Sequence, residues 1–240
     1  LSTILYRTVG RQPAPLIIRT RGHRLEGIWH SGSPMGGLLN FMRGINFLVP
    51  RNMTKAAGFY NSIIQTDEPA FIIEPLNAYR VKEKMPLNLG EYCYELGKIE
   101  ILKKGKDISI ISYGSTLNLV IDSISEFDAL GIDVEIIDIQ TLIPFDISKE
   151  ILISVRKTNR IIIIDEDVPG GASSYILHKL IDEQGIFNYL DSSPKTLTAK
   201  DHRPPYGTDG DYFSKPSIDD IVESVYKIMN ESNPNKYPLL

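Results

Sequence analysis

The stretch that decides the fold is DISIISYG at residues 107–114, an apolar strand that runs into a glycine turn. A helix is predicted over 116–130, ended by Gly131. Two more apolar strands follow, at 134–139 and 160–165. Continuous apolar runs are typical of parallel strands buried on both faces. This alternation of strands and helices predicts a parallel α/β sheet with right-handed crossovers.

The rest of the second half extends this pattern. Asp146 and Ser217 are expected to cap helices, and Gly170-Gly171 to lead one. The expected elements are helices over 146–155, 173–183 and 217–229, an edge strand over 197–200 and a loose tail over 230–240.

The first half shows the same alternation more weakly. Its expected elements are strands at 15–19, 45–49 and 70–74 and helices at 34–42 and 54–65. Thr54 is the expected cap of the second helix. Residues 76–95 lose periodicity, so we place a domain boundary there, between residues 88 and 89. The chain opens with Leu1, in a stretch typical of helix, and is expected to be part of a longer polypeptide.

Composition sets broad limits on class. Hydrophobic residues make up 42% and charged residues 23% of 240 positions, which is ordinary for a globular chain. A formal net charge of −4 gives no electrostatic footprint for nucleic acid. No apolar run approaches the roughly 20 residues of a membrane span, and no signal peptide is expected. The single cysteine, Cys93, excludes an internal disulfide and favours a cytoplasmic location.

His30 is the first candidate for chemistry, because it lies in a short Gly/Ser segment ahead of the predicted helix at 34–42. Such segments open at the ligand-binding edge of α/β sheets, where a titratable imidazole is useful. Two interpretations remain open from the residues: an acid/base role, or a hydrogen bond within the loop.

A basic cluster, RTRGHR at 19–24, follows the first strand. Guanidinium groups suit carboxylate or phosphate recognition, and an equally open interpretation is a surface loop that pairs with acidic residues. His202, in a polar loop after the edge strand, is a further candidate for lining a site.

Other polar motifs favour structural interpretations. The carboxylates at 165–167 would allow metal binding, but a solvated strand end with a helix cap is favoured. SYGS at 112–115 is favoured as a strand–helix turn over an anion site. DGD at 209–211 is interpreted as a turn, and His178 as a surface or packing histidine. The sequence predicts no metal site.

Several segments occur in the order of a known family. The first half carries IRT at 18–20, His30-Ser31 before a helix, Val49-Pro50, DEPAFIIEP at 67–75 and Tyr79-Arg80. The second half carries LGK at 96–98, GKDISIISYG at 105–114, IDIQTLIPFD at 137–146 and Asp165-Glu166. Over nearly the whole chain this series resembles the β subunit of thiamine-diphosphate-dependent 2-oxoacid dehydrogenases of the 2-oxoisovalerate and pyruvate type.

The resemblance implies an α/β fold of two parallel-sheet, three-layer domains. Residues 1–88 would form part of a pyrimidine-binding domain for thiamine diphosphate, and residues 89–240 a transketolase carboxy-terminal-like domain.

The resemblance also implies residue roles. His30 matches the loop histidine that faces the cofactor thiazolium and moves protons during acyl transfer to lipoamide. Ser31 is expected to support that loop, and Arg21 or His23 to guide an anionic substrate. The family's cofactor-activating glutamate and its stacking aromatic lie upstream of the segment that matches Leu1. Many relatives carry a run of glycines where this chain has RGHR at 21–24, which leaves its substrate channel open to question.

The implied cofactors are thiamine diphosphate with Mg²⁺, bound with an α-type subunit or fused α domain that carries the diphosphate motif, and a lipoyl group as acyl acceptor. The implied partners are that α part, a second β copy in an α2β2-like assembly, and a lipoyl acyltransferase. A branched-chain 2-oxoacid is favoured, pyruvate next, and the chain alone is predicted to be inactive. The alternatives are a transketolase-like sugar-phosphate enzyme and a non-catalytic docking module.

Overall fold

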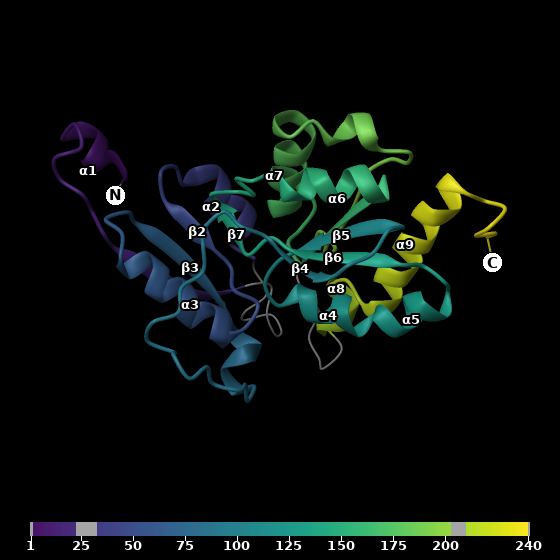
Figure 1. Ribbon diagram of the computed structural model, residues 1–240, viewed down its shortest axis with the longest axis horizontal. Helices are drawn as coiled ribbons and strands as arrows, with labels where there is room; N and C mark the ends of the chain where they lie inside the picture. The colour runs from purple at the N-terminus through teal and green to yellow at the C-terminus, as the bar shows by residue number, and fades with distance from the viewer. Residues whose placement is uncertain (1, 23–32, 203–209, 240) are drawn as a thin grey trace.

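Two β-sheets organise the molecule, as the computed structural model shows over residues 2–22, 33–202 and 210–239 (Figure 1). The first sheet has the strand order β1-β3-β2-β7 and the second β4-β6-β5-β8-β9. The strands of the first sheet are β1 Ile17–Gly22, β2 Asn46–Leu48, β3 Ala70–Pro75 and β7 Thr141–Ile143. Those of the second are β4 Glu100–Lys103, β5 Ile108–Ser112, β6 Val134–Asp138, β8 Ile161–Ile164 and β9 Lys195–Leu197.

Helices surround both sheets. In the first half they are α1 Ser2–Arg7, α2 Met35–Phe41, α3 Met53–Ile64 and the 3-10 turn η1 Leu76–Arg80. In the second half they are α4 Thr116–Asp122, α5 Ile124–Ala129, α6 Glu150–Thr158, α7 Ala172–His178, the π-helical η2 Lys179–Glu183, η3 Ile186–Tyr189, α8 Gly210–Ser214 and α9 Ile218–Ser232. The second sheet lies between α6 and α7 on one face and α4, α5 and α9 on the other (Figure 1). The predicted α/β class with layered sheets is therefore confirmed.

One hydrophobic core joins the two sheets. Residues Phe47 and Ile73 of the first sheet share a buried cluster with Ile111 and Ile163 of the second, and α2, α6 and α7 pack into it. A second cluster lies under α4 and α9, and a smaller one between α3 and the first sheet. The face of the first sheet that carries α2 therefore packs directly toward the α7 side of the second sheet.

Two antiparallel strands were not predicted. β7 pairs antiparallel with β2, and β4 pairs antiparallel with β6, while every other pairing is parallel. β7 comes from the second half of the chain but completes the sheet of the first half. Both strands are short edge strands, so neither carries the continuous apolar run that marked the parallel strands.

Several predicted boundaries are corrected. β1 runs to Gly22 because it pairs with β3 along its length, so the first part of RTRGHR is strand rather than loop. β9 lies at 195–197 rather than 197–200, because its pairing with β8 stops at Ile164. The predicted helix at 116–130 is interrupted at Ser123, whose hydroxyl donates to the carbonyl of Leu119 over 2.7 Å. Such back-bonding bends helices.

The helix caps are partly as predicted. Ser217 forms a capping box with Asp220 at the start of α9, and Asp146 accepts hydrogen bonds from the first amides of α6. The cap of α3 is Asn52, not Thr54, since the Asn52 side chain accepts from Lys55 N over 2.8 Å.

The carboxy-terminal segment is not loose as far as Tyr237. α9 continues to Ser232, and Tyr237 is buried with its carbonyl accepting from Asn230. The sequence at 210–211, interpreted as part of a turn, begins helix α8.

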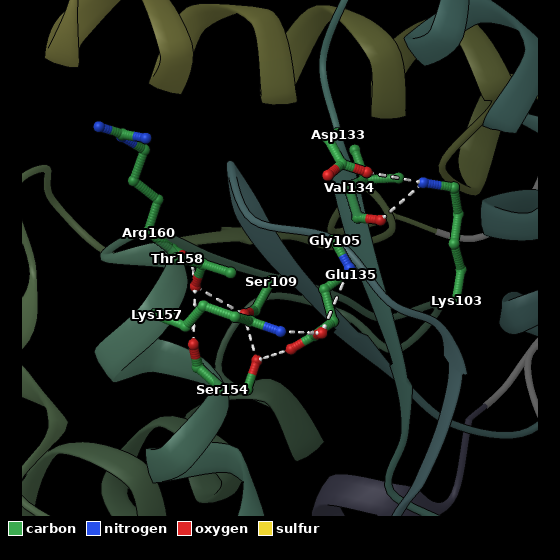
Figure 2. Close-up of polar contacts among 10 residues, drawn as sticks. All are labelled: Lys103, Gly105, Ser109, Asp133, Val134, Glu135, Ser154, Lys157, Thr158 and Arg160. Carbon is green, nitrogen blue, oxygen red and sulfur yellow. Dashed lines mark hydrogen bonds and ion pairs between the residues drawn. The ribbon is translucent and has the colours of Figure 1, made fainter.

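A buried polar network holds α6 against the second sheet (Figure 2). The Glu135 carboxylate on β6 is fully buried and accepts hydrogen bonds from Ser154 and Lys157 of α6. Ser109 on β5 lies 2.6 Å from the Ser154 hydroxyl and 2.8 Å from that of Thr158. Because every group in this network has a partner, burial of the carboxylate is compensated.

In the described ranges, no helix combines the length and apolar character needed to cross a membrane.

Candidate functional site

The end of β1 is the centre of the candidate site. A Cβ placed on Gly22 would lie 3.3 Å from the Pro34 ring, so these two residues approach each other closely. The same Cβ would lie 3.4 Å from Ile73 of β3, so Gly22 is packed against the sheet. The predicted residues His23, His30 and Ser31 lie outside the described residues.

Beside Gly22, a buried carboxylate is held by three side chains. Glu74, at the end of β3, is 1% exposed. It accepts a hydrogen bond from Tyr60 of α3 over 2.6 Å, another from Tyr79 of η1, and forms an ion pair with Arg19 at 3.0 Å. This Glu74 cluster therefore joins β1, β3, α3 and η1 at one edge of the sheet.

The tyrosines of the cluster are held in their neutral form. Burial and the hydrogen bond to Glu74 raise the pKa of Tyr60 well above its ordinary value, and the same causes raise the pKa of Tyr79. Both phenols consequently act as hydrogen-bond donors to the carboxylate at physiological pH.

Two arginines of RTRGHR have different environments at this cluster. Arg19 pairs with an acidic residue of its own sheet, which was one of the two open interpretations of this motif. Arg21 is exposed on β1 and stands opposite Glu74 in the strand register. Arg21 therefore remains at the candidate edge as an accessible cation. Tyr60 was not a predicted site residue, since nothing in a helical stretch marks which tyrosine reaches a strand end.

The acidic motif at 165–167 is buried, so its interpretation as a solvated strand end is wrong. Asp165, Glu166 and Asp167 are 0%, 6% and 3% exposed. Tyr113 donates to Asp165 over 2.6 Å, and burial together with the Asp165 charge raises the pKa of that phenol well above its ordinary value. The helix-cap part of the prediction is confirmed, since Asp165 accepts from Ser173 N at 2.9 Å.

Asp167 reaches across to the first half of the molecule. Its Oδ2 accepts from Gly36 N of α2 over 2.9 Å and from Ala172 N of α7 over 3.2 Å. The starts of two helices, one from each half, therefore share one carboxylate oxygen.

A second polar contact joins the halves at the end of β6. Arg51 donates to Asp138 over 2.8 Å and to Glu100 over 2.5 Å, and Lys55 lies 2.7 Å from Glu100. Burial raises the pKa of Asp138 to about 6, against the opposing effect of Arg51. The hydrogen bonds from Arg51 and Lys55 lower the pKa of Glu100, although burial acts in the other direction.

The remaining sequence candidates lie elsewhere. His202 is exposed beyond β9, with its ring 5.6 Å from that of Phe213. It thus belongs to the edge of the second sheet, whereas Arg21 belongs to the first. His178 is on the surface and contacts Asp182 at 2.8 Å. SYGS at 112–115 forms a strand–helix turn, with Gly114 at a φ of +59°. Across residues 2–22, 33–202 and 210–239, no group of three or more His, Cys, Asp or Glu side chains could hold a metal ion.

The chain is similar in sequence to known proteins over most of its length. Residues 97–215 match the family model described as transketolase, C-terminal domain. The chain is 28% identical to the β subunit of acetoin:2,6-dichlorophenolindophenol oxidoreductase from Bacillus subtilis, over 94% of this chain and 65% of that protein. It is 33% identical to the pyruvate dehydrogenase E1 component subunit β of Mesostigma viride, over 78% of this chain and 56% of that protein. It is 34% identical to the mitochondrial 2-oxoisovalerate dehydrogenase subunit β of Chaetomium thermophilum, over 65% of this chain and 34% of that protein.

Solved structures support the fold. A split-gene transketolase, described as an inactive β4 tetramer, matches with a TM-score of 0.72 at 19% identity, over 90% of this chain and 68% of that chain. A transketolase mutant from Pichia stipitis matches with a TM-score of 0.62 at 14% identity, over 90% of this chain and 30% of that chain. The chain thus spans 65% or less of the three relatives named above. It has the transketolase-like fold and is homologous to the E1 β subunits of pyruvate and other 2-oxoacid dehydrogenases, with a transketolase C-terminal domain from residue 97.

Proposed function

We propose that this chain acts as the β-type part of a 2-oxoacid dehydrogenase. Its reaction would be the oxidative decarboxylation of a 2-oxoacid, followed by reductive acylation of a lipoyl group on an acyltransferase. The observation that carries this proposal is the close approach of Gly22 to Pro34 beside the Glu74 cluster, because His30 lies between these two residues in the sequence. This edge also lies at the junction of the two sheets, because α2 packs against both halves.

His30 is the proposed acid/base group. An imidazole gains and loses a proton near physiological pH, as proton transfer to and from an acyl acceptor requires. Arg21 is the proposed guide for the substrate carboxylate, because it is exposed at the same sheet edge. His23, Ser31 and His202 remain proposed contributors to the loop and the channel.

The described carboxylates do not fit the cofactor's needs. Glu74 is held by two tyrosines and an arginine, and Asp167 by backbone amides. Neither carboxylate fits the activation of an aminopyrimidine or the binding of a magnesium diphosphate. We therefore propose that thiamine diphosphate and Mg²⁺ are bound with an α-type partner, as the β-subunit names of the relatives imply.

Three further assignments belong to this proposal. The chain alone is inactive, a second β copy and a lipoyl acyltransferase complete the assembly, and the domain boundary lies between residues 88 and 89. A branched-chain acid is the proposed substrate, with pyruvate next. The identities of 34% to a 2-oxoisovalerate enzyme and 33% to a pyruvate enzyme leave the choice to the assay.

The test is reduction of an artificial electron acceptor by the complete assembly with thiamine diphosphate and Mg²⁺. The substrates compared are 2-oxoisovalerate, pyruvate, 2-oxoglutarate and, because of one relative's name, acetoin. Turnover of a 2-oxoacid, with lipoyl acylation impaired in His30→Ala, supports the proposal. An assembly that binds the cofactor but turns over none of the 2-oxoacids contradicts it. Turnover of a sugar phosphate would identify a transketolase-like enzyme instead.

A further inference from the structure

A patch of apolar and basic side chains faces solvent on the connection after η1. Its apolar members are 61%, 69% and 108% exposed: Val81, Met85 and Leu87. Its basic members are also exposed, and within the described part of the chain they form no ion pair: Arg80, Lys82 and Lys84. These six residues are named the 80–87 ridge. Single apolar residues are common on protein surfaces, whereas a group of them rimmed by polar residues marks an interaction site.

The one carboxylate in this stretch is used within the fold. Glu83, the acidic residue at positions 80–87, is half-buried and accepts hydrogen bonds from the amides of Met53 and Thr54, each over 3.1 Å. Those amides begin α3, where a carboxylate stabilises the helix. The ridge therefore presents a net positive charge, on a chain whose formal net charge is −4.

The backbone that carries the ridge is held beside α3, although it has no regular secondary structure (Figure 1). Glu83 binds the start of α3 on one side. On the other side, the Asn61 side chain donates to the carbonyls of Leu89 and Tyr92, each over 2.9 Å. The ridge is thus presented in a defined position. A partner that binds it pays little conformational entropy to order it, which favours affinity.

We infer that the 80–87 ridge is a docking surface for the α-type partner, whose contacting surface carries carboxylates beside apolar side chains. The inference rests on the proposed function. The ridge begins directly after Tyr79, which donates to Glu74 at the candidate edge. A partner that supplies the cofactor's groups at this edge therefore lies next to the start of the ridge.

The chemistry of the ridge favours an acidic protein surface over other occupants. Its cations attract carboxylates and speed association, while burial of its apolar side chains slows dissociation. Basic clusters that bind anionic lipid usually contain about four to eight Lys or Arg residues. The ridge has three, and its fixed backbone suits a partner with a matching shape.

The apolar part of the ridge is tested with the double variant Met85→Ser and Leu87→Ser. Its control is Ile153→Ser with Phe187→Ser, because these side chains are each 64% exposed and lie in the second half of the chain. All four side chains are exposed, so thermal unfolding of both variants is expected to match that of the parent.

The charge of the ridge is tested separately with Lys82→Glu and Lys84→Glu. Its control is Lys104→Glu with Lys106→Glu, a pair of exposed lysines at the same spacing in the second half. The two tests are independent, so one remains informative if the variant of the other fails to fold.

The measurement is the Kd of the α-type subunit for the full chain, at low and at high salt. The apolar variant is expected to raise Kd about tenfold or more and to keep the salt dependence of the parent. The charge variant should raise Kd about tenfold at low salt and remove most of the salt dependence, because the attracting cations are lost. Both controls should bind as the parent does.

Amide hydrogen exchange identifies the molecule that covers the ridge. Protection of residues 80–89 by the α-type subunit supports the inference. Protection of them instead by the acyltransferase, by a second copy of the chain, or by vesicles of phosphatidylserine and phosphatidylcholine overturns it.

Failure of the inference differs from failure of the proposed function. Both ridge variants binding the α-type subunit as tightly as the parent, or a parent that does not bind it, overturns the docking surface. The proposed function is tested by turnover. An assembly that forms through the ridge but turns over no 2-oxoacid contradicts the proposed function and not the docking surface.

Discussion

Tyr60 of α3 donates a hydrogen bond from its hydroxyl to Glu74 at the end of β3 over 2.6 Å, and this contact joins a helix to the sheet edge where β1 ends at Gly22. Glu74 is 1% exposed, so each lost donor leaves a buried charge less well compensated. Arg19, the cation of the cluster, has a side chain that is 65% exposed, and its contribution is weakened by water. The two tyrosine hydroxyls therefore provide much of the compensation for the buried charge of Glu74.

Tyr60→Phe is expected to lower the free energy of unfolding by about 1–3 kcal/mol, because a buried acceptor is left under-satisfied. Urea denaturation measures the change. Tyr212→Phe is the control, since Tyr212 is exposed and its hydroxyl contacts Asp219 only at 3.3 Å. Equal stabilities of the Tyr60 and Tyr212 variants would show that the cluster adds nothing to the fold.

Arg51 links the two halves of the chain, because it lies in the first half and binds Asp138 and Glu100 of the second. Arg51→Met is expected to destabilise the protein by about 3–5 kcal/mol, because Asp138 is fully buried and, within the described part of the chain, would keep a single hydrogen bond, from Gln140 N. Replacing both residues, as Arg51→Met with Asp138→Leu, should recover most of this loss, because the unpaired buried charge is removed as well. A double variant no more stable than Arg51→Met would mean that the charge on Asp138 is not what the arginine compensates.

Asp138 also predicts a pH dependence. Burial raises its pKa from 3.8 to about 6, so the folded state binds a proton that the unfolded state releases between these values. The contribution of Asp138 to the free energy of unfolding is therefore largest below pH 4. It falls by roughly 3 kcal/mol as the pH rises to about 6. Asp138→Asn lacks this change.

The measurement is the difference in unfolding free energy between Asp138→Asn and the parent, by urea titration from pH 4 to pH 7. This difference should shift in favour of the variant as the pH rises. A difference that stays constant would show that the carboxyl does not titrate in this range.

Much of this fold could be predicted from periodicity alone, and the exceptions have physical reasons. The strands β3, β5, β6 and β8 are buried on both faces and rich in isoleucine, so they are easily recognised. β4 and β7 are defined by antiparallel neighbours rather than by their own patterns, so no local signal marks them. The π-helical end of α7 likewise leaves no mark in the sequence.

The site was less predictable than the fold because its contacts are long-range. The sequence placed His30 and Arg21 at a sheet edge, but Asp167 was assigned to solvent, since three consecutive acids are usually exposed. Its partner is an amide, which every residue carries, so the sequence holds no sign of that contact. Gly36 and Gly171 were the available signal, because paired glycines mark close approach of backbones.

The connection after η1 packs so closely on α3 that replacing a helical glycine by alanine is expected to destabilise the protein, the opposite of the usual effect. Gly58 lies in the middle of α3, where alanine normally stabilises a helix by about 1 kcal/mol. A Cβ there would lie 2.4 Å from the Tyr94 ring and 2.7 Å from the Tyr92 ring. Tyr92 donates to Thr54 O, and the Tyr94 ring has Lys55 at 3.6 Å, so neither ring can move without losing a contact.

Gly58→Ala is therefore expected to destabilise the protein by about 1–3 kcal/mol through overpacking. Gly90→Ala, at a position of the same connection with open space around it, should change stability by less than about 0.5 kcal/mol. Thermal unfolding of both variants checks the pair. A Gly58 variant as stable as the parent would mean that the rings shift freely.

The network around Glu135 predicts that two substitutions within it have coupled effects on the free energy of unfolding. Ser109 on β5 and Ser154 on α6 are 2.6 Å apart, and Ser154 also donates to the Glu135 carboxylate (Figure 2). Removing either hydroxyl takes one of its hydrogen-bond partners from the other, which keeps Thr158 or Glu135, whereas removing both leaves fewer unsatisfied atoms. Ser109→Ala and Ser154→Ala should therefore be non-additive, with an interaction energy of about 0.5–3 kcal/mol in a double-mutant cycle.

Ser62 of the first half, which donates to Tyr94 O, supplies the control. The effects of Ser109→Ala and Ser62→Ala on the free energy of unfolding should add within about 0.5 kcal/mol. Additivity in the first pair would show that the two hydroxyls bind the carboxylate and Thr158 independently, and that α6 is held by its apolar face alone.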